Sequence, residues 1–406
     1  MNNIEKLKFY IDSLCIYNVG SDEVITKLYA LLENAENENA FRCYGEFFNS
    51  LTKQGDSLKH YISSLILFDE NVFSRAAASG EVEKLSDSVI SGVKSDLEKL
   101  DAISEIKADD IANEENREIL KTLPAWEIGE PVKELEGGIK NAFEALMQYH
   151  RINGYGIFAK HCAFTWRNRA FVPITSIDKI RLSDLKNYEI QRNQVVENTL
   201  AFLGGFPANN VLLYGDRGTG KSSTVHAILN EYKNRGLRII EISKGDICDL
   251  ALIREKIADN PMKFIIFVDD LSFDKKEDSL SQLKAALEGT LSKREGNALI
   301  YATSNRRHIV KENFTEREND VHTGDTIQEE LSLSDRFGLA VNFLNPDKSN
   351  YLDIVKKIAS DRDFDWDEEE LLSGAELWAR RRGGRSPRCA KQYIDYLEAS
   401  KKMTDN

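Results

Sequence analysis

An eight-residue motif in the middle of the chain constrains its fold more than any other feature. The motif has the spacing G-x-x-x-x-G-K-[ST] of a phosphate-binding loop and reads Gly215-Asp216-Arg217-Gly218-Thr219-Gly220-Lys221-Ser222. The residues around it predict an apolar strand at 211–214 and a helix at 223–232. The glycines allow a tight turn that turns backbone N–H groups toward phosphate oxygens, and the helix start adds positive dipole character. Strand, loop and helix together argue against a chance match.

Two residues of this loop have separate predicted tasks. Lys221 can reach the β- and γ-phosphates of a nucleotide, and the hydroxyl of Ser222 can bind Mg²⁺. The rest of the loop and the next residue, Ser223, are predicted to hold the nucleotide through the backbone. The sequence therefore predicts a nucleotide site at 215–223.

A second apolar run, Phe264-Ile265-Ile266-Phe267-Val268, ends in the adjacent carboxylates Asp269 and Asp270. Such an uninterrupted run is typical of a strand in a sheet that is covered on both faces. Asp269 can bind Mg²⁺ directly or through water, and Asp270 can polarise an attacking water. Apolar strands often end in Asp by chance, but the position of this pair after a complete phosphate-binding loop favours a functional site.

Polar residues near two further predicted strands extend this site. Asn305 follows the strand 298–303, where it can hold the attacking water or sense the γ-phosphate. Arg336 precedes the strand 339–343 at the predicted edge of the domain. In a ring of subunits it can reach a neighbour's γ-phosphate and stabilise the transition state, and the alternative is an ordinary surface arginine.

The last segment, 346–406, is predicted to form a small helical lid with helices at 351–361, 367–382 and 387–401. Ser386 and Pro387 are a strong start signal for the last helix. Arg388, in its first turn, can fold back over the phosphates. The basic run 380–385 could contact nucleic acid, but a solvated helix end with favourable dipole placement explains it better.

Helical periodicity dominates residues 1–170, which we expect to form an all-helical domain for recognition or assembly. A stripe of apolar residues follows the cap Ser21-Asp22 at helical spacing: Val24, Ile25, Leu28, Leu31 and Leu32. Residues 171–210 are predicted to be a linker and a helix that lead into an α/β core at 211–345. In that linker, Ile180, Leu182 and Tyr188 are candidates for an apolar wall against a base, with simple packing as the alternative.

Charge and composition exclude several classes of protein. The first 150 residues carry 28 acidic and 15 basic side chains, and the remaining 256 carry 39 of each. The acidic part would repel a phosphate backbone, so nucleic-acid binding is possible but is not supported by charge. We expect no transmembrane helix and no signal peptide. The five scattered cysteines suggest neither a disulfide framework nor a zinc site and fit a reducing cytoplasm.

These motifs come in the order of AAA+ ATPases, and over about residues 175–402 the chain resembles that family. By resemblance, Lys221 and Ser222 are the Walker A residues and Asp269 and Asp270 are Walker B. Three more residues correspond to sensor 1 (Asn305), the arginine finger (Arg336) and sensor 2 (Arg388). Asp270 is a departure, because AAA+ proteins usually have Glu there. The shorter side chain is expected to set the water further away and slow turnover.

Three stretches look closer still to one uncharacterised bacterial family of AAA+ ATP-binding proteins with a helical N-terminal region: 215–223, 267–273 and 301–308. A further apolar run at 237–243 predicts one more strand, which makes a five-stranded parallel sheet flanked by helices. The resemblance to AAA+ ATPases implies that the sheet and the lid bind ATP and hydrolyse it with Mg²⁺. It also implies an oligomer, which we expect to remodel a protein partner docked on the helical domain. A nucleotide-dependent binding switch and a DNA-acting loader or motor stay open as alternatives. The role of the acidic loop 312–330 also stays open.

Overall fold

The computed structural model of the chain separates into two compact units, one of residues 1–160 with 259–262 and the other of 161–258 with 263–406. The structure describes residues 2–55, 57–111, 118, 122–272, 278–288, 296–305, 336–362 and 366–404. Within these ranges, no helix combines the length and the apolar character needed to cross a membrane.

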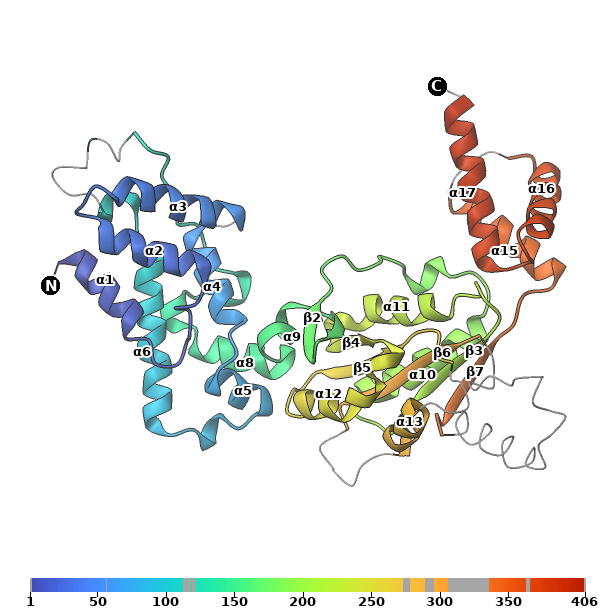
Figure 1. Ribbon diagram of the computed structural model, residues 1–406, viewed down its shortest axis with the longest axis horizontal. Coiled ribbons are helices and arrows are strands. Elements are labelled where there is room, and N and C mark those ends of the chain that lie inside the picture. Colours follow the sequence, from blue (N-terminus) through green and yellow to red (C-terminus); the bar gives the residue numbers. More distant parts are fainter. Residues whose placement is uncertain are drawn as a thin grey trace. The chain divides into compact units, whose positions relative to one another are not determined.

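The first unit is helical, as predicted (Figure 1). Its second helix, α2, buries the predicted apolar stripe, and the Asp22 carboxylate caps that helix by accepting the N–H groups of Val24 and Ile25 at 3.0 and 3.1 Å. The helices pack around one apolar core that includes the buried rings of Phe47 and Phe73. The α-helices whose bounds the structure describes are α1 (Asn3–Asp12), α2 (Glu23–Asn34), α3 (Ala40–Lys53), α4 (Leu58–Leu67), α5 (Val72–Ser79), α6 (Asp87–Ser104), α8 (Phe143–Asn153) and α9 (Gly156–Lys160).

The second unit contains a sheet whose strands lie in the order β2-β1-β4-β5-β6-β3-β7. Every described pair in it is parallel except β1 with β2. The strands are β1 (Ala163–Arg167), β2 (Ala170–Pro173), β3 (Val211–Gly215), β4 (Leu237–Ile242), β5 (Lys263–Val268), β6 (Ala298–Ser304) and β7 (Leu339–Phe343). The α/β P-loop fold and all five predicted parallel strands, β3 to β7, are therefore confirmed.

The prediction of five strands was wrong by two, because β1 and β2 join the sheet beside β4. Their residues were assigned to the helical domain 1–170 and the following linker, whereas the second unit already begins at His161. The two strands form a hairpin whose turn residues Asn168 and Arg169 have φ of 51° and 58°. A turn with both central residues at positive φ usually carries Asn-Gly or Asp-Gly. Because Arg169 stands where glycine is usual, the sequence does not predict this hairpin.

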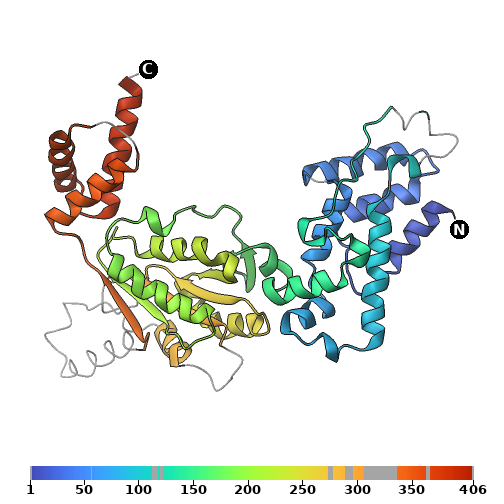
Figure 2. The same cartoon turned by 180° about the vertical axis from the view of Figure 1, so that it is seen from behind.

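Both faces of the sheet are covered, which explains the uninterrupted apolar strands. One face packs against α10 (Glu189–Leu203) and α11 (Lys221–Tyr232), and α10 is seen across the strands from behind in Figure 2. That face carries Val211, Leu213, Ile239, Ile265, Phe267, Tyr301, Val341 and Phe343. The alternate residues, such as Leu212 and Ile266, are also buried. The other α-helices described in the core are α12 (Leu250–Ile257) and α13 (Asp278–Glu288).

Three helices after β7 form the predicted lid: α15 (Lys348–Ser360), α16 (Glu368–Arg381) and α17 (Pro387–Thr404). They share a small apolar core around Tyr351 and Ile394. The Ser386 hydroxyl accepts the N–H of Cys389 at 3.2 Å, so the predicted start of the last helix is confirmed. The segment before α10 is bonded to this lid, because Lys186 pairs with Asp361 at 2.5 Å and Lys357 donates to Asn187 at 3.1 Å.

Candidate active site

The carboxyl ends of β3, β5 and β6 lie side by side, and each carries predicted site residues directly after it. The phosphate-binding loop follows β3, Asp269 and Asp270 follow β5, and Asn305 follows β6. In parallel α/β sheets, ligands bind outside these strand ends. The fold therefore brings together residues that are far apart in the sequence, at the place where a ligand is expected.

The loop after β3 has the backbone that its glycines permit. Gly215, Gly218 and Gly220 have φ of 128°, 77° and 92°, a region that other residues rarely adopt. A Cβ atom added to Gly215 would lie 2.2 Å from the carbonyl oxygen of Phe343, so only glycine fits between β3 and β7 here. After Gly220 the chain enters α11, whose first N–H groups lack partners within the helix. These donors and the helix dipole fit an anion.

Lys221 is the first residue of α11 and is only 7% exposed. Its ammonium donates to the carbonyl oxygens of Gly215 at 2.9 Å and Asp216 at 2.7 Å, and it lies 3.5 Å from the side-chain oxygen of Asn305. Burial lowers the pKa of Lys221, and the nearby carboxylates partly offset this effect. A charge buried at a strand end, with only neutral partners at hydrogen-bond distance, fits a site that receives an anionic group.

Ser222 and Asp269 meet beside Lys221, where the serine hydroxyl donates to the carboxylate at 2.6 Å. Hydroxyl and carboxylate oxygens are the hard ligands that Mg²⁺ takes, and Mg²⁺ is usually held by one or two carboxylates together with substrate phosphates. Among the described residues no cluster of three or more His, Cys, Asp or Glu side chains could hold a metal by itself. The donor set therefore fits Mg²⁺ bound jointly with a nucleotide.

Asp270 has a φ of 51°, in the left-handed region. Asp and Asn enter this region far more readily than other residues with side chains, because their short polar groups bond locally. This gives a physical reason for Asp at a position where AAA+ proteins usually have Glu. The side-chain amide of Asn305 donates to the Asp270 carboxylate at 2.5 Å, so the two predicted residues lie together.

Thr303, near the end of β6, is a site residue that the sequence prediction missed. Its buried hydroxyl accepts the N–H of Asp270 at 2.9 Å and donates to the carboxylate of Asp269 at 2.5 Å. One hydroxyl therefore orients both acidic residues, and it also supports the left-handed backbone at Asp270. A threonine inside an apolar strand gives no signal of this role, because threonine is common in strands.

The lid lies against the phosphate-binding loop. The N–H of Arg388, in the first turn of α17, donates to the carbonyl oxygen of Gly218 at 3.1 Å. Asp216 binds the segment between β7 and the lid, because its carboxylate accepts the N–H of Asn345 at 2.7 Å and its own N–H donates to Phe343. Asp216, predicted to bind the nucleotide, thus has its carboxylate on this connecting segment.

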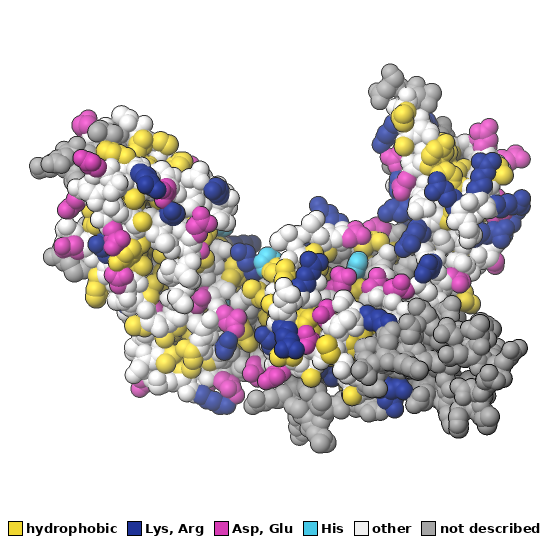
Figure 3. Space-filling model, viewed as in Figure 1, with side chains coloured by type: hydrophobic (Ala, Val, Ile, Leu, Met, Phe, Trp, Pro, Cys, Tyr) yellow, Lys and Arg dark blue, Asp and Glu magenta, His cyan; other side chains and the backbone are white. Residues whose placement is uncertain are grey.

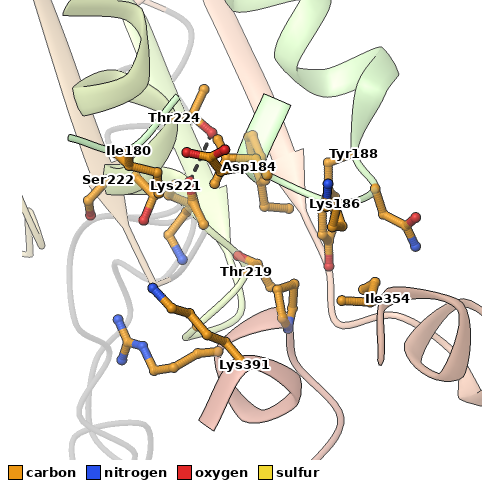
Figure 4. Close-up of a pocket in the computed structure, with 18 of the residues that line it drawn as sticks. Ile180, Asp184, Lys186, Tyr188, Thr219, Lys221, Ser222, Thr224, Ile354 and Lys391 are labelled. Atoms are coloured by element: carbon orange, nitrogen blue, oxygen red, sulfur yellow. Dashed lines mark hydrogen bonds between the residues drawn. The ribbon is translucent and has the colours of Figure 1, made fainter. Parts of the chain in front are cut away.

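A cavity of about 1090 Å³ lies between the core and the lid of this unit. Among the predicted residues, the loop from Arg217 to Ser223 lines it, and so do Asp269, Asp270, Asn305 and Arg388, whereas Gly215 and Asp216 do not. Figure 4 shows Lys221 and Ser222 on one side of the cavity and Tyr188 and Ile354 on the other. Tyr188 and Ile354 therefore lie across the cavity from the predicted phosphate-binding residues.

Two of the three candidates for the apolar wall line this cavity, Ile180 and Tyr188, together with Ile354 and Ile358 of the lid. Leu182 packs against the core instead. The ring of Tyr188 lies 5.4 Å from that of Phe343, and its hydroxyl donates to Leu344 at 2.5 Å. Burial, with a smaller contribution from Asp216, raises the pKa of Tyr188 to about 12. A neutral, fixed ring is suited to pack against a planar base.

Arg336 does not line this cavity. It precedes β7, whose first residue pairs with Val211 and whose last pairs with Gly215, so it lies at the opposite end of the strand from the phosphate-binding loop. The five residues of β7 span about 16 Å, and this length separates Arg336 from the phosphate-binding loop of its own site. The acidic loop 312–330 lies outside the described residues.

Residues 159–401 match one protein family, described as "Protein of unknown function (DUF815)". The chain belongs to this family. The match begins just before β1 and ends within α17, so it covers the α/β core and the lid. The predicted resemblance to an uncharacterised family is therefore confirmed. A comparison with curated protein sequences found no match.

Solved structures similar to this chain include the Thermotoga maritima RuvB Holliday junction branch migration motor, with 18% identity and a TM-score of 0.39. AMPPCP-bound DnaA from Aquifex aeolicus has 20% identity and a TM-score of 0.38. The matches cover 55% and 54% of this chain, and 66% and 65% of the other two. The likeness thus spans just under two thirds of each neighbour. What these neighbours act on is not transferred to this member of the DUF815 family.

Proposed function

We propose that this DUF815 protein binds ATP with Mg²⁺ and hydrolyses it to ADP and phosphate. The observation that carries the proposal is the meeting of Lys221, Ser222 and the two Walker B carboxylates at adjacent strand ends. Thr303 orients these carboxylates, and Arg388 of the lid lines the same cavity. A structural glycine turn would not need this set of polar groups around it.

The roles follow from the positions of the groups. The loop N–H groups and Lys221 hold the phosphates, and Ser222 and Asp269 hold Mg²⁺, which neutralises charge on the phosphate oxygens when bound. Asn305 orients a water whose proton passes to Asp270 as its oxygen attacks the γ-phosphorus. The bond from that phosphorus to the β–γ bridging oxygen then breaks, and ADP leaves. Arg388 stabilises the charge that develops on the phosphates.

Replacing Lys221 tests this proposal directly. Lys221→Ala is expected to lower Mg·ATP hydrolysis by about 10²–10³-fold, because a buried cation aimed at the phosphates is lost. The measurement is phosphate release by purified protein. Lys53→Ala, at an exposed position of α3, is the matched control and should leave the rate unchanged. Wild-type protein with no more activity than the Lys221 variant would refute hydrolysis.

Thr303→Val removes the hydroxyl and keeps the shape of the side chain. We expect kcat to fall by about 10- to 100-fold, because Asp270 loses the bond that holds its backbone and Asp269 loses a donor. The KM for ATP should change little, since the phosphate-binding loop is untouched. Thr303→Ser, which keeps the hydroxyl, should recover most of the rate. Equal kcat in the Val variant and the wild type would show that Thr303 does not position these residues.

Two further parts of the proposal concern assembly. Arg336, at the far end of β7 from its own site, is proposed to serve the site of a neighbouring subunit in a ring, and light scattering with Mg·AMPPCP tests this oligomer. The acidic helical unit is proposed to dock a protein partner that ATP turnover remodels. Affinity capture with Asp270→Asn, which should stay in the ATP-bound state, tests for that partner. A monomer under all conditions would remove the role of Arg336.

A further inference from the structure

The lid carries cations that differ in their partners. Most of its described lysines and arginines have an acidic, amide or aromatic partner. Examples are Arg385, which forms two bonds to Glu376 at 2.8 and 3.0 Å, and Arg382, which lies 4.6 Å from the ring of Trp378. The full set with such partners is Lys348, Lys356, Lys357, Arg362, Arg382, Arg385, Lys401 and Lys402. Most described lid cations thus have a partner within the second unit.

Three lid cations, Arg381, Arg388 and Lys391, have no side-chain partner among the described residues, whereas Arg380 is close enough to Glu376 to help lower the pKa of that carboxyl. Arg380 and Arg381 lie in the last turn of α16, away from the cavity, and Lys and Arg side chains gather on the lid surface seen in Figure 3. Arg388 and Lys391 both line the cavity. They are three residues apart on α17, so they lie on the same face of the helix.

The direction of these two side chains points to the phosphate side of the cavity. Arg388 is close enough to Lys221 for its charge to contribute to the lowered pKa of that lysine. Figure 4 shows Lys391 extending from α17 toward the side of the cavity that holds Lys221, away from Tyr188 and Ile354. Three cations from two parts of the fold, Lys221, Arg388 and Lys391, thus line the region in which Asp269 and Asp270 also lie. A phosphate chain that binds there together with Mg²⁺ would bring negative charge to all three cations.

We propose that Lys391 is a second lid residue that binds the phosphate chain of the nucleotide, beside Arg388. This rests on the proposed function, since it takes the nucleotide to be the ligand. Two lid cations attract a triphosphate more strongly than a diphosphate, because the triphosphate carries more charge. Lys391 therefore makes the affinity for the nucleotide depend on the γ-phosphate.

Calorimetric titration with Mg·AMPPCP and Mg·ADP tests this role. Lys391→Ala is expected to weaken AMPPCP binding about tenfold and ADP binding about two- to threefold, since one charge-assisted contact is lost. Lys391→Arg should recover most of the affinity, and Arg381→Ala, a partnerless lid cation outside the cavity, should bind like the wild type. Inorganic tripolyphosphate should compete for the wild-type site and about tenfold less well for the Ala variant.

The possible results separate this proposal from the proposed function. Wild-type affinity of the Ala variant for both nucleotides would overturn the role of Lys391. If Lys221→Ala still abolished binding in that case, the nucleotide site itself would stand. Equal weakening toward AMPPCP and ADP would overturn the dependence on the γ-phosphate. A wild-type protein that binds neither nucleotide would overturn both proposals. An unchanged melting temperature is expected for the Ala variant, because the side chain of Lys391 is exposed and lacks partners.

Discussion

Asp270→Asn is expected to lower the rate of ATP hydrolysis by at least about a hundredfold, because the amide cannot accept the proton of the attacking water. Affinity for Mg·AMPPCP should change by less than about threefold, since the phosphate-binding loop, Lys221 and Asp269 keep their places. Asn tolerates the left-handed backbone as well as Asp does, so the fold is preserved. Single-turnover hydrolysis measured beside calorimetric binding gives both quantities.

Asp270→Glu is the informative companion variant. It restores a carboxylate, and it also matches the residue usual in AAA+ proteins. Because Glu is less favourable than Asp at a φ of 51°, and because its added methylene displaces the carboxylate from Asn305, we expect a rate below that of the wild type. Turnover unchanged in Asp270→Asn would remove this residue from the chemistry. It would also favour the alternative of a nucleotide-dependent binding switch.

Gly215→Ala is expected to destabilise the second unit by more than about 3 kcal/mol, the largest effect on stability that we predict for one methyl group. The new Cβ would lie 2.2 Å from the carbonyl oxygen and 2.6 Å from the carbonyl carbon of Phe343. Both atoms belong to the backbone of β7, which cannot move away without breaking the pairing of β3 with β7. The φ of 128° adds strain of its own.

Chemical denaturation followed by circular dichroism measures this effect. Gly205→Ala is the matched control, because that glycine also has a positive φ of 75° but has no atom within 4 Å of an added Cβ. The control should cost about 1 kcal/mol, the conformational penalty alone. If the two variants were equally stable, close packing of β7 against Gly215 would not be the constraint at this position.

Much of the site could be predicted from the sequence, because its main residues follow apolar strands directly. The phosphate-binding loop, the pair Asp269-Asp270 and Asn305 each lie at the end of a strand that the apolar pattern predicts. Parallel strands bring such ends together whatever the lengths of the connections. The lid helices and their start at Pro387 followed from capping and periodicity, which are local signals.

Other parts depend on contacts between residues distant in the sequence. Thr303 could not be recognised, because its hydroxyl gains a role only when β5 and β6 pair. The left-handed backbone at Asp270 could not be predicted either, because the bond from its N–H to Thr303 forms between two strands that are distant in the sequence. The hairpin of β1 and β2 was missed because Arg169 occupies a turn position that is usually a glycine.

The sequence by itself determined the chemistry of the strand ends, since residue type and spacing decide which groups can hold phosphate and Mg²⁺. The tertiary structure alone decided the number of strands, the turning of the Asp216 carboxylate toward the lid connection, and the placing of Lys391 beside Arg388 in the cavity. The physical reason is that each of these depends on which segments pack together, and packing is a property of the whole unit.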